Sequence, residues 1–184
     1  RDYDKIFHSK DPDKGFRWIT SQVGTNWRMT EMQAAIGRLL LRRLDDWIVI
    51  RRRNANIFTE TLKDLPALRI PQPKENVYHA YYKFYVFIDP SSFQKDWTKA
   101  KFIDELNELG VPCAEGSCPF MPREEVFKDV LYPDGSKGYF YQENFYPNAT
   151  KVAQESLMFL VHPTLTEDEV NWMATTVADL VNKV

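Results

Sequence analysis

The chain has 184 residues, which is enough for one ordinary domain or for one large part of a bigger enzyme. Hydrophobic residues make up 43% of it and aromatic residues 14%, which is typical of a globular chain with a sizeable core. The net charge of -2 argues against nucleic acid as a partner. No apolar run approaches the roughly 18 residues that a membrane span needs, so we expect a cytoplasmic protein without a membrane partner.

The two cysteines, Cys113 and Cys118, form a Cys-x4-Cys pair with no histidine near it in sequence. Zinc sites use more ligands than this, so we expect no metal. The cysteine count favours reduced thiols in an intracellular protein, and it is also compatible with one disulfide.

Residues 1–24 are polar, charged and aromatic, and they predict surface loop. They include neither an initiating Met nor a signal peptide, so we expect the chain to be cut from something longer. Thr30 and Gln33 then predict a capping box at the start of a long helix that continues to about Lys63. A break near 47–51 is an alternative, because so long a helix is unusual. Its apolar stripe consists of Ile36, Leu40, Leu44, Trp47, Ile48, Ala55, Phe58 and Leu62.

The rest of the chain alternates between strand and helix patterns. This order predicts an α/β (α+β) two-layer sandwich, in which helices cover a small mixed or antiparallel sheet. Gly110 is the expected C-terminal cap of one helix, and Thr166 with Glu169 predicts a capping box for the last helix. Strands are predicted at 68–73, 77–89, 111–116 and 156–163, and helices at 97–109, 147–155 and from 166 onward, with a helical turn near 124–130.

The run Arg51-Arg52-Arg53 lies inside the long predicted helix, which also carries acidic residues. Charge runs of this length are usually solvated, so we interpret these arginines as an exposed helix face.

The stretch "GTNWRMTEMQAAIG", Gly24 to Gly37, resembles the DegT/DnrJ/EryC1/StrS family of sugar aminotransferases, which are pyridoxal-phosphate (PLP) enzymes of fold type I. The resemblance continues through "RLDDWIVIRRRNA", "HAYYKFYVF", "GVPCAEGSCPF" and "SLMFLVHPTLTEDEV". It implies the C-terminal part of an aspartate-aminotransferase-like fold. On this basis residues 1–29 end the large PLP domain or connect to it, residues 30–65 form an interdomain helix, and residues 66–184 form the small domain.

The resemblance also implies a function for the parent protein. It would transfer an amino group, from glutamate, to a nucleotide-linked keto-sugar in surface-polysaccharide (O-antigen or lipopolysaccharide) biosynthesis. It would act as a homodimer, because family sites are shared between subunits. The family's Schiff-base lysine lies in a stretch like "H-x-x-K-N…G-E-G-G", and "FHSKDPDKG" around Lys10 does not match it. We therefore expect no catalytic residue in this chain, no PLP bound by it alone, and a requirement for its own N-terminal PLP domain.

Four residues are the site candidates that the resemblance implies. Asn26 occupies the position that contacts the cofactor phosphate of the other subunit, and Arg28 offers a planar fork of donors for a phosphate or a carboxylate. Alternatively, Asn26 braces a turn and Arg28 forms an interface ion pair. His79 either contacts a substrate hydroxyl or phosphate, or is a half-buried core histidine. Arg123, with Cys118, is a weaker candidate for substrate contact at the site entrance.

Two rival hypotheses remain open at this point. One is a relative within the family that acts as a sugar dehydratase or a regulator, with the imine lysine replaced. The other is a stand-alone interaction module in which the helix at 30–63 pairs with a partner.

Overall fold

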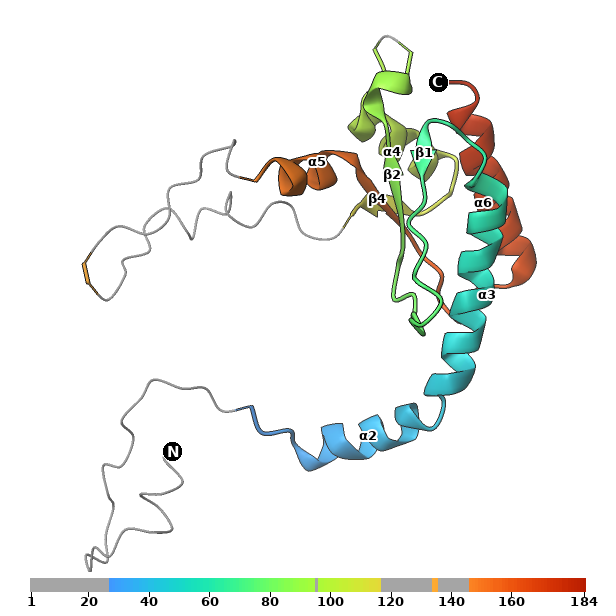
Figure 1. Ribbon diagram of the computed structural model, residues 1–184. Coiled ribbons are helices and arrows are strands. Elements are labelled where there is room, and N and C mark those ends of the chain that lie inside the picture. The colour runs from blue at the N-terminus through green and yellow to red at the C-terminus, as the bar shows by residue number, and fades with distance from the viewer. Residues whose placement is uncertain (1–26, 95, 117–133, 136–145) are drawn as a thin grey trace, which may run out of the picture. The chain divides into compact units, whose positions relative to one another are not determined.

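The computed structural model describes residues 27–94, 96–116, 134–135 and 146–184 (Figure 1). The chain divides into two units, residues 1–42 and 43–184, which are described here one at a time. Asn26, Cys118, Arg123 and the helical turn predicted near 124–130 lie outside the described residues.

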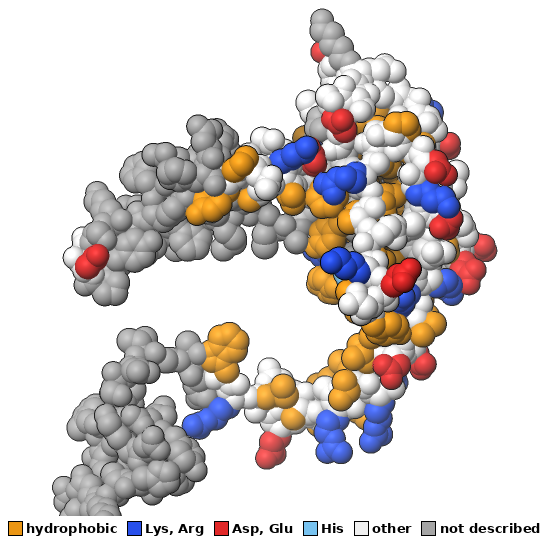
Figure 2. Space-filling view, viewed as in Figure 1, with side chains coloured by type: hydrophobic (Ala, Val, Ile, Leu, Met, Phe, Trp, Pro, Cys, Tyr) orange, Lys and Arg blue, Asp and Glu red, His pale blue; other side chains and the backbone are white. Residues whose placement is uncertain are grey.

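The first unit contains helix α2, Glu31–Leu41. Its predicted capping box is confirmed: the Gln33 backbone N–H donates to Thr30 Oγ1 over 3.3 Å, and the Thr30 N–H donates to Gln33 Oε1 over 2.9 Å. Apolar side chains are visible along this helix in Figure 2. No residue of α2 is buried, and its exposed apolar residues are Met32, Ile36, Leu39, Leu40 and Leu41.

The prediction of one uninterrupted helix from Thr30 to Lys63 was wrong. Helix α3, Leu44–Leu62, begins after a break at Arg42 and Arg43, which precedes the alternative break predicted near 47–51. The break has a local cause, because Asp45 and Asp46 lie in the first turn of α3. Carboxylates are stabilised beside the unpaired N–H groups of a helix start, so they favour a new helix here.

The second unit is built on a four-stranded antiparallel sheet, which confirms the predicted fold class. Its spatial order is β1-β2-β4-β3, and Phe84 lies opposite Phe159 in the central pair. The strands pack against helices in two layers, with a short 3-10 helix at Pro90–Ser92. The strands are β1 Leu68–Arg69, β2 Phe84–Ile88, β3 Cys113–Glu115 and β4 Ser156–Phe159, and the further helices are α4 Lys99–Glu108, α5 Pro147–Glu155 and α6 Glu167–Val181.

One face of the sheet packs on α3, α4 and α6, and α3 lies beside α6 (Figure 1). Phe58 of α3 is at the centre of this layer. Its ring stacks on Phe84 and on Phe159, with 5.3 Å between ring centroids in both cases. The apolar face of α6 is part of the core, since Val170, Met173, Ala174, Val177 and Val181 are all buried.

Gly110 ends α4 as predicted, with a φ of 87° that disfavours any residue with a Cβ. The Val111 N–H donates to Leu106 O over 2.8 Å and the Gly110 N–H donates to Asn107 O over 3.0 Å. These two bonds form a Schellman motif, which satisfies carbonyls at the helix end.

The strand predicted at 77–89 forms only in its second half, as β2. Tyr81 has a φ of 45°, which no strand residue adopts, and the chain before Phe84 is irregular. His79 and Tyr81 therefore do not lie on a strand. The cause is tertiary, because arginine side chains from α3 bind the carbonyls of this segment, as described below.

Cys113 is buried, and burial raises the pKa of its thiol to about 12. A thiol needs its ionised form to react, so we expect Cys113 to be inert near neutral pH. In a Cys118→Ser variant, where Cys113 is the single thiol, a chromogenic disulfide reagent at pH 8 should label less than about a tenth of the native chain. The same reagent should label one thiol per chain in denaturant. Rapid native labelling would contradict the burial.

Among the described residues, no helix combines the length and the apolar character needed to cross a membrane.

Candidate functional site

The two site candidates within the described residues belong to different units. Arg28 lies in the first unit, ahead of α2, and its side chain is exposed. His79 lies in the second unit, in the irregular segment before β2, and it is exposed rather than buried in the core. The interpretation of His79 as a half-buried core histidine was therefore wrong, while its contact with substrate stays a prediction.

Two arginines of α3 bind the segment that contains His79. Arg51 Nη1 donates to Tyr81 O over 3.2 Å and to Tyr82 O over 3.0 Å. Arg52 Nη1 donates to His79 O over 3.1 Å, and its guanidinium lies 4.7 Å from the centroid of the Tyr78 ring. We call Arg51 and Arg52 the arginine clamp, and residues 77–83 the histidine segment.

The histidine segment is also ordered by bonds of its own. The Tyr81 N–H donates to His79 Nδ1 over 3.1 Å, and the two rings meet edge to face at 4.3 Å. The positive φ of Tyr81 is unfavourable for a bulky residue, so contacts from outside the segment are needed to hold it. The arginine clamp supplies such contacts.

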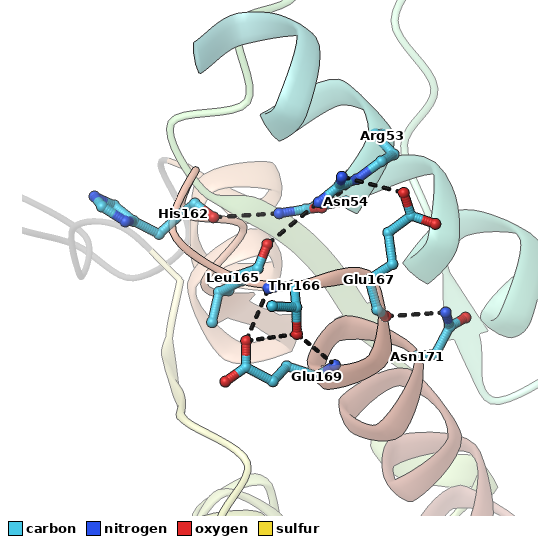
Figure 3. Close-up of polar contacts among 8 residues, drawn as sticks. All are labelled: Arg53, Asn54, His162, Leu165, Thr166, Glu167, Glu169 and Asn171. Atoms are coloured by element: carbon cyan, nitrogen blue, oxygen red, sulfur yellow. Dashed lines mark hydrogen bonds and ion pairs between the residues drawn. The ribbon is translucent and has the colours of Figure 1, made fainter. Parts of the chain in front are cut away.

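The third arginine of the run, Arg53, joins α3 to the turn that precedes α6 (Figure 3). Its guanidinium donates to Asn54 Oδ1 and to Leu165 O, and it pairs with Glu167 Oε1 at 3.1 Å. Asn54 is fully buried, and its Nδ2 donates to His162 O over 3.2 Å. The interpretation of residues 51–53 as a solvated face was wrong, because all three are half-buried and bind backbone carbonyls.

The turn before α6 is held by its own side chains as well. His162 Nδ1 lies 2.8 Å from Thr164 Oγ1, so His162 supports this turn. The predicted capping box of α6 is confirmed too, since the Glu169 N–H donates to Thr166 Oγ1 and the Thr166 N–H donates to Glu169 Oε2 over 2.8 Å. Donation from the Thr166 backbone N–H and, to a lesser degree, from the Thr166 hydroxyl lowers the pKa of the Glu169 carboxyl.

An open depression of about 440 Å³ lies over this turn. Most of its polar groups have protein partners, because Arg53 pairs with Glu167 and Thr166 caps α6, while Asp168 is exposed at its edge. A second depression, of about 270 Å³, lies beside β1 and α5. There Glu155 pairs with both Arg69 and Lys151 at 3.7 Å. In both depressions most of the charged groups are paired within the protein, so both are best explained as structural features.

The sequence profile of the DegT/DnrJ/EryC1/StrS aminotransferase family matches residues 5–178. The chain belongs to this family. The match runs through α2, the arginine clamp, the histidine segment and the turn before α6, so these features are part of a DegT-family chain. The family is one of PLP-dependent sugar aminotransferases, and solved structural neighbours carry PLP.

Three known proteins illustrate the similarity. A solved aminotransferase from Psychrobacter cryohalolentis is 37% identical, with a TM-score of 0.75 over 99% of this chain and 46% of its own. The spore coat polysaccharide biosynthesis protein SpsC of Bacillus subtilis is 25% identical over 86% of this chain and 38% of its own length. GDP-4-keto-6-deoxy-D-mannose 3-dehydratase of Yersinia pseudotuberculosis is 32% identical over 67% of this chain and 30% of its own length. The chain thus spans less than half of each of them.

PLP binding requires a lysine amine for the imine and donors for the phosphate. Among the described lysines, two have partners that disfavour formation of an imine with PLP. Lys99 donates to Ala153 O over 2.9 Å and pairs with Glu115, and its side chain is 15% exposed. A hydrogen bond from Lys63 to Glu60 raises the pKa of Lys63, which keeps that amine protonated. Lys99 and Lys63 are therefore poor candidates for the imine, and Arg28 stays a predicted ligand of the phosphate.

Sequence reasoning missed the arginine clamp and the Arg53–Asn54 network. A run of three arginines is a weak signal, because its spacing on the helix gives no indication of which distant carbonyls the guanidinium groups reach. The one available hint was that the run lies in a stretch that carries the family resemblance.

Proposed function

We propose that this chain is the C-terminal part of a PLP-dependent nucleotide-sugar aminotransferase. The parent transfers an amino group from glutamate to a nucleotide-linked keto-sugar in surface-polysaccharide biosynthesis. One observation supports this most strongly: the chain is 37% identical to a solved aminotransferase over 99% of its length, within a family of sugar aminotransferases. The parent acts as a cytoplasmic homodimer, and residues 30–65 connect its PLP domain to the small domain at 66–184.

The proposal gives each candidate residue a role. Asn26 and Arg28 bind the phosphate of the cofactor that the neighbouring subunit holds. His79 binds an oxygen of the sugar or of its phosphates, and Arg123 contacts substrate at the entrance. None of them performs the chemistry. When bound, PLP supplies the electron sink for amino transfer, and the imine lysine belongs to the N-terminal domain of the parent.

The test compares this chain with its parent. The chain alone, mixed with PLP and treated with borohydride, should give no stoichiometric lysine adduct, whereas the parent should give one per subunit. The parent should also transfer nitrogen from ¹⁵N-glutamate to a nucleotide-linked 4-keto-sugar, with GDP-4-keto-6-deoxy-D-mannose as one substrate of the panel. A stoichiometric adduct on the chain alone would contradict its assigned role, and a parent without any amino transfer would contradict the function.

A sugar dehydratase is the second candidate. It is favoured by the 32% identity to the Yersinia GDP-4-keto-6-deoxy-D-mannose 3-dehydratase over two thirds of this chain. The same assay separates the two candidates. An aminotransferase product retains the ¹⁵N label, while a dehydratase product has lost water and carries no label.

A further inference from the structure

The contacts between the arginine clamp and the histidine segment bear on how the His79 side chain is oriented. Both clamp residues are half-buried, and their three hydrogen bonds all end on backbone carbonyls of residues 79, 81 and 82. In most strands, such carbonyls would bond to a neighbouring strand. Here the guanidinium groups of Arg51 and Arg52 bind these carbonyls in place of a neighbouring strand. The segment can therefore adopt a backbone conformation that is incompatible with a sheet.

The backbone conformation of the histidine segment determines which nitrogen of the His79 ring carries the proton. The Tyr81 N–H donates to Nδ1, so Nδ1 is an acceptor and carries no proton. A neutral imidazole with an acceptor at Nδ1 has its proton on Nε2. Because His79 is exposed, Nε2–H is a hydrogen-bond donor available to a ligand oxygen.

The Nδ1 contact depends on the backbone of residues 79–81. The Tyr81 N–H reaches back two residues to His79 Nδ1, so a change in the backbone torsions between them would turn the donor away. Arg51 binds the carbonyl of Tyr81 itself and that of the next residue, while Arg52 binds the carbonyl of His79. The clamp therefore holds both ends of the Nδ1 contact.

We propose that Arg51 and Arg52 are positioning residues, which hold the histidine segment so that His79 directs an Nε2–H donor at an oxygen of the sugar nucleotide. The geometric part of this inference concerns the chain alone, and the substrate part rests on the proposed function. The oxygen can belong to a sugar hydroxyl, a keto group or a phosphate, which are all acceptors for one N–H donor.

The first experiment tests the geometry without any activity. In ¹⁵N NMR of histidine-labelled chain at alkaline pH, where imidazole is neutral, the His79 ring should show a single tautomer with the proton on Nε2. The double variant Arg51→Ala/Arg52→Ala should show a mixture of tautomers, and Lys63→Ala, an exposed change at the C-terminal cap of the same helix, should leave the spectrum unchanged. A wild-type ring protonated on Nδ1, or a double variant with an unchanged tautomer, would overturn the clamp.

The second experiment tests the role at the substrate, using the parent with GDP-4-keto-6-deoxy-D-mannose or whichever 4-keto-sugar nucleotide of the panel it converts. Loss of one ligand hydrogen bond costs up to about tenfold in binding, so Arg52→Ala should raise KM about tenfold and change kcat by less than about threefold. In a His79→Ala background, Arg52→Ala should change KM by less than about twofold, because the group it positions is gone. Arg52→Lys retains one donor and should restore part of the loss.

The two experiments separate the possible failures. An active parent in which Arg52→Ala raises KM equally with and without His79 overturns the positioning role and leaves the proposed function intact. A parent without amino transfer overturns the proposed function. The NMR result then tests by itself whether Arg51 and Arg52 fix the tautomer of His79.

Discussion

Phe58→Ala should destabilise the chain by about 3–5 kcal/mol, the range for truncating a fully buried aromatic residue. The side chain has no exposed surface, and its ring contacts both central strands through Phe84 and Phe159 at 5.3 Å. Truncation removes apolar burial, leaves a cavity between α3 and the sheet, and abolishes two aromatic stacks. Equilibrium unfolding in urea, followed by circular dichroism, measures the change in the free energy of unfolding.

Two further variants make this result interpretable. Phe58→Leu retains most of the volume and should cost about 1–1.5 kcal/mol, which keeps the prediction testable if the alanine variant does not fold. Val49→Ala removes an apolar side chain from the same helix at a position that is 61% exposed, and it should change stability by less than about 0.5 kcal/mol. A loss below about 1.5 kcal/mol for Phe58→Ala would show that this layer of the core is not packed as described.

Helix starts and ends could be predicted from sequence because their determinants are local. Thr30 with Gln33, Thr166 with Glu169, and Gly110 each act within four residues along the chain, and each was predicted in its observed role. The range 147–155 matches α5, which has a proline at its first position. The family profile and the antiparallel sheet confirm the predicted family and fold class.

The start of β2 and the split of the long helix could not be predicted in the same way. The residues before Phe84 are aromatic and typical of a strand, but their carbonyls bind Arg51 and Arg52, which lie about thirty positions earlier. The apolar stripe of the predicted long helix is buried at Ala55, Phe58 and Leu62 and half-buried at Trp47 and Ile48, while Ile36, Leu40 and Leu44 are exposed.

The candidate site was predictable only as far as the resemblance reaches. It identified Asn26, Arg28, His79 and Arg123, and their roles stay predictions. His79 lies in the irregular segment instead of on a strand face, and this difference matters for its chemistry. A strand would orient the ring by alternation alone, whereas the segment fixes a tautomer through a backbone donor.

Asn54→Ala should destabilise the chain by about 2–3 kcal/mol, although the residue is polar, because its amide is completely buried and bonded on both sides. Its Nδ2 donates to His162 O, and its Oδ1 accepts from Arg53 Nε over 3.1 Å and Nη2 over 2.9 Å. Truncation removes all three bonds and leaves a buried void beside a half-buried guanidinium. Urea unfolding measures the loss, and Asn171→Ala is the matched control, since Asn171 makes one exposed bond to Glu167 O and should cost less than about 1 kcal/mol.

A double-mutant cycle shows whether Asn54 acts through the arginine. Arg53 binds Asn54, Leu165 O and Glu167, so one guanidinium joins α3 to the turn and to the first residue of α6 (Figure 3). If the three contacts form one network, Arg53→Ala in an Asn54→Ala background should cost about 1 kcal/mol less than it does in the wild type. Strict additivity would mean that Asn54 stabilises the turn through His162 O alone, and that the arginine reaches α6 independently of its neighbour.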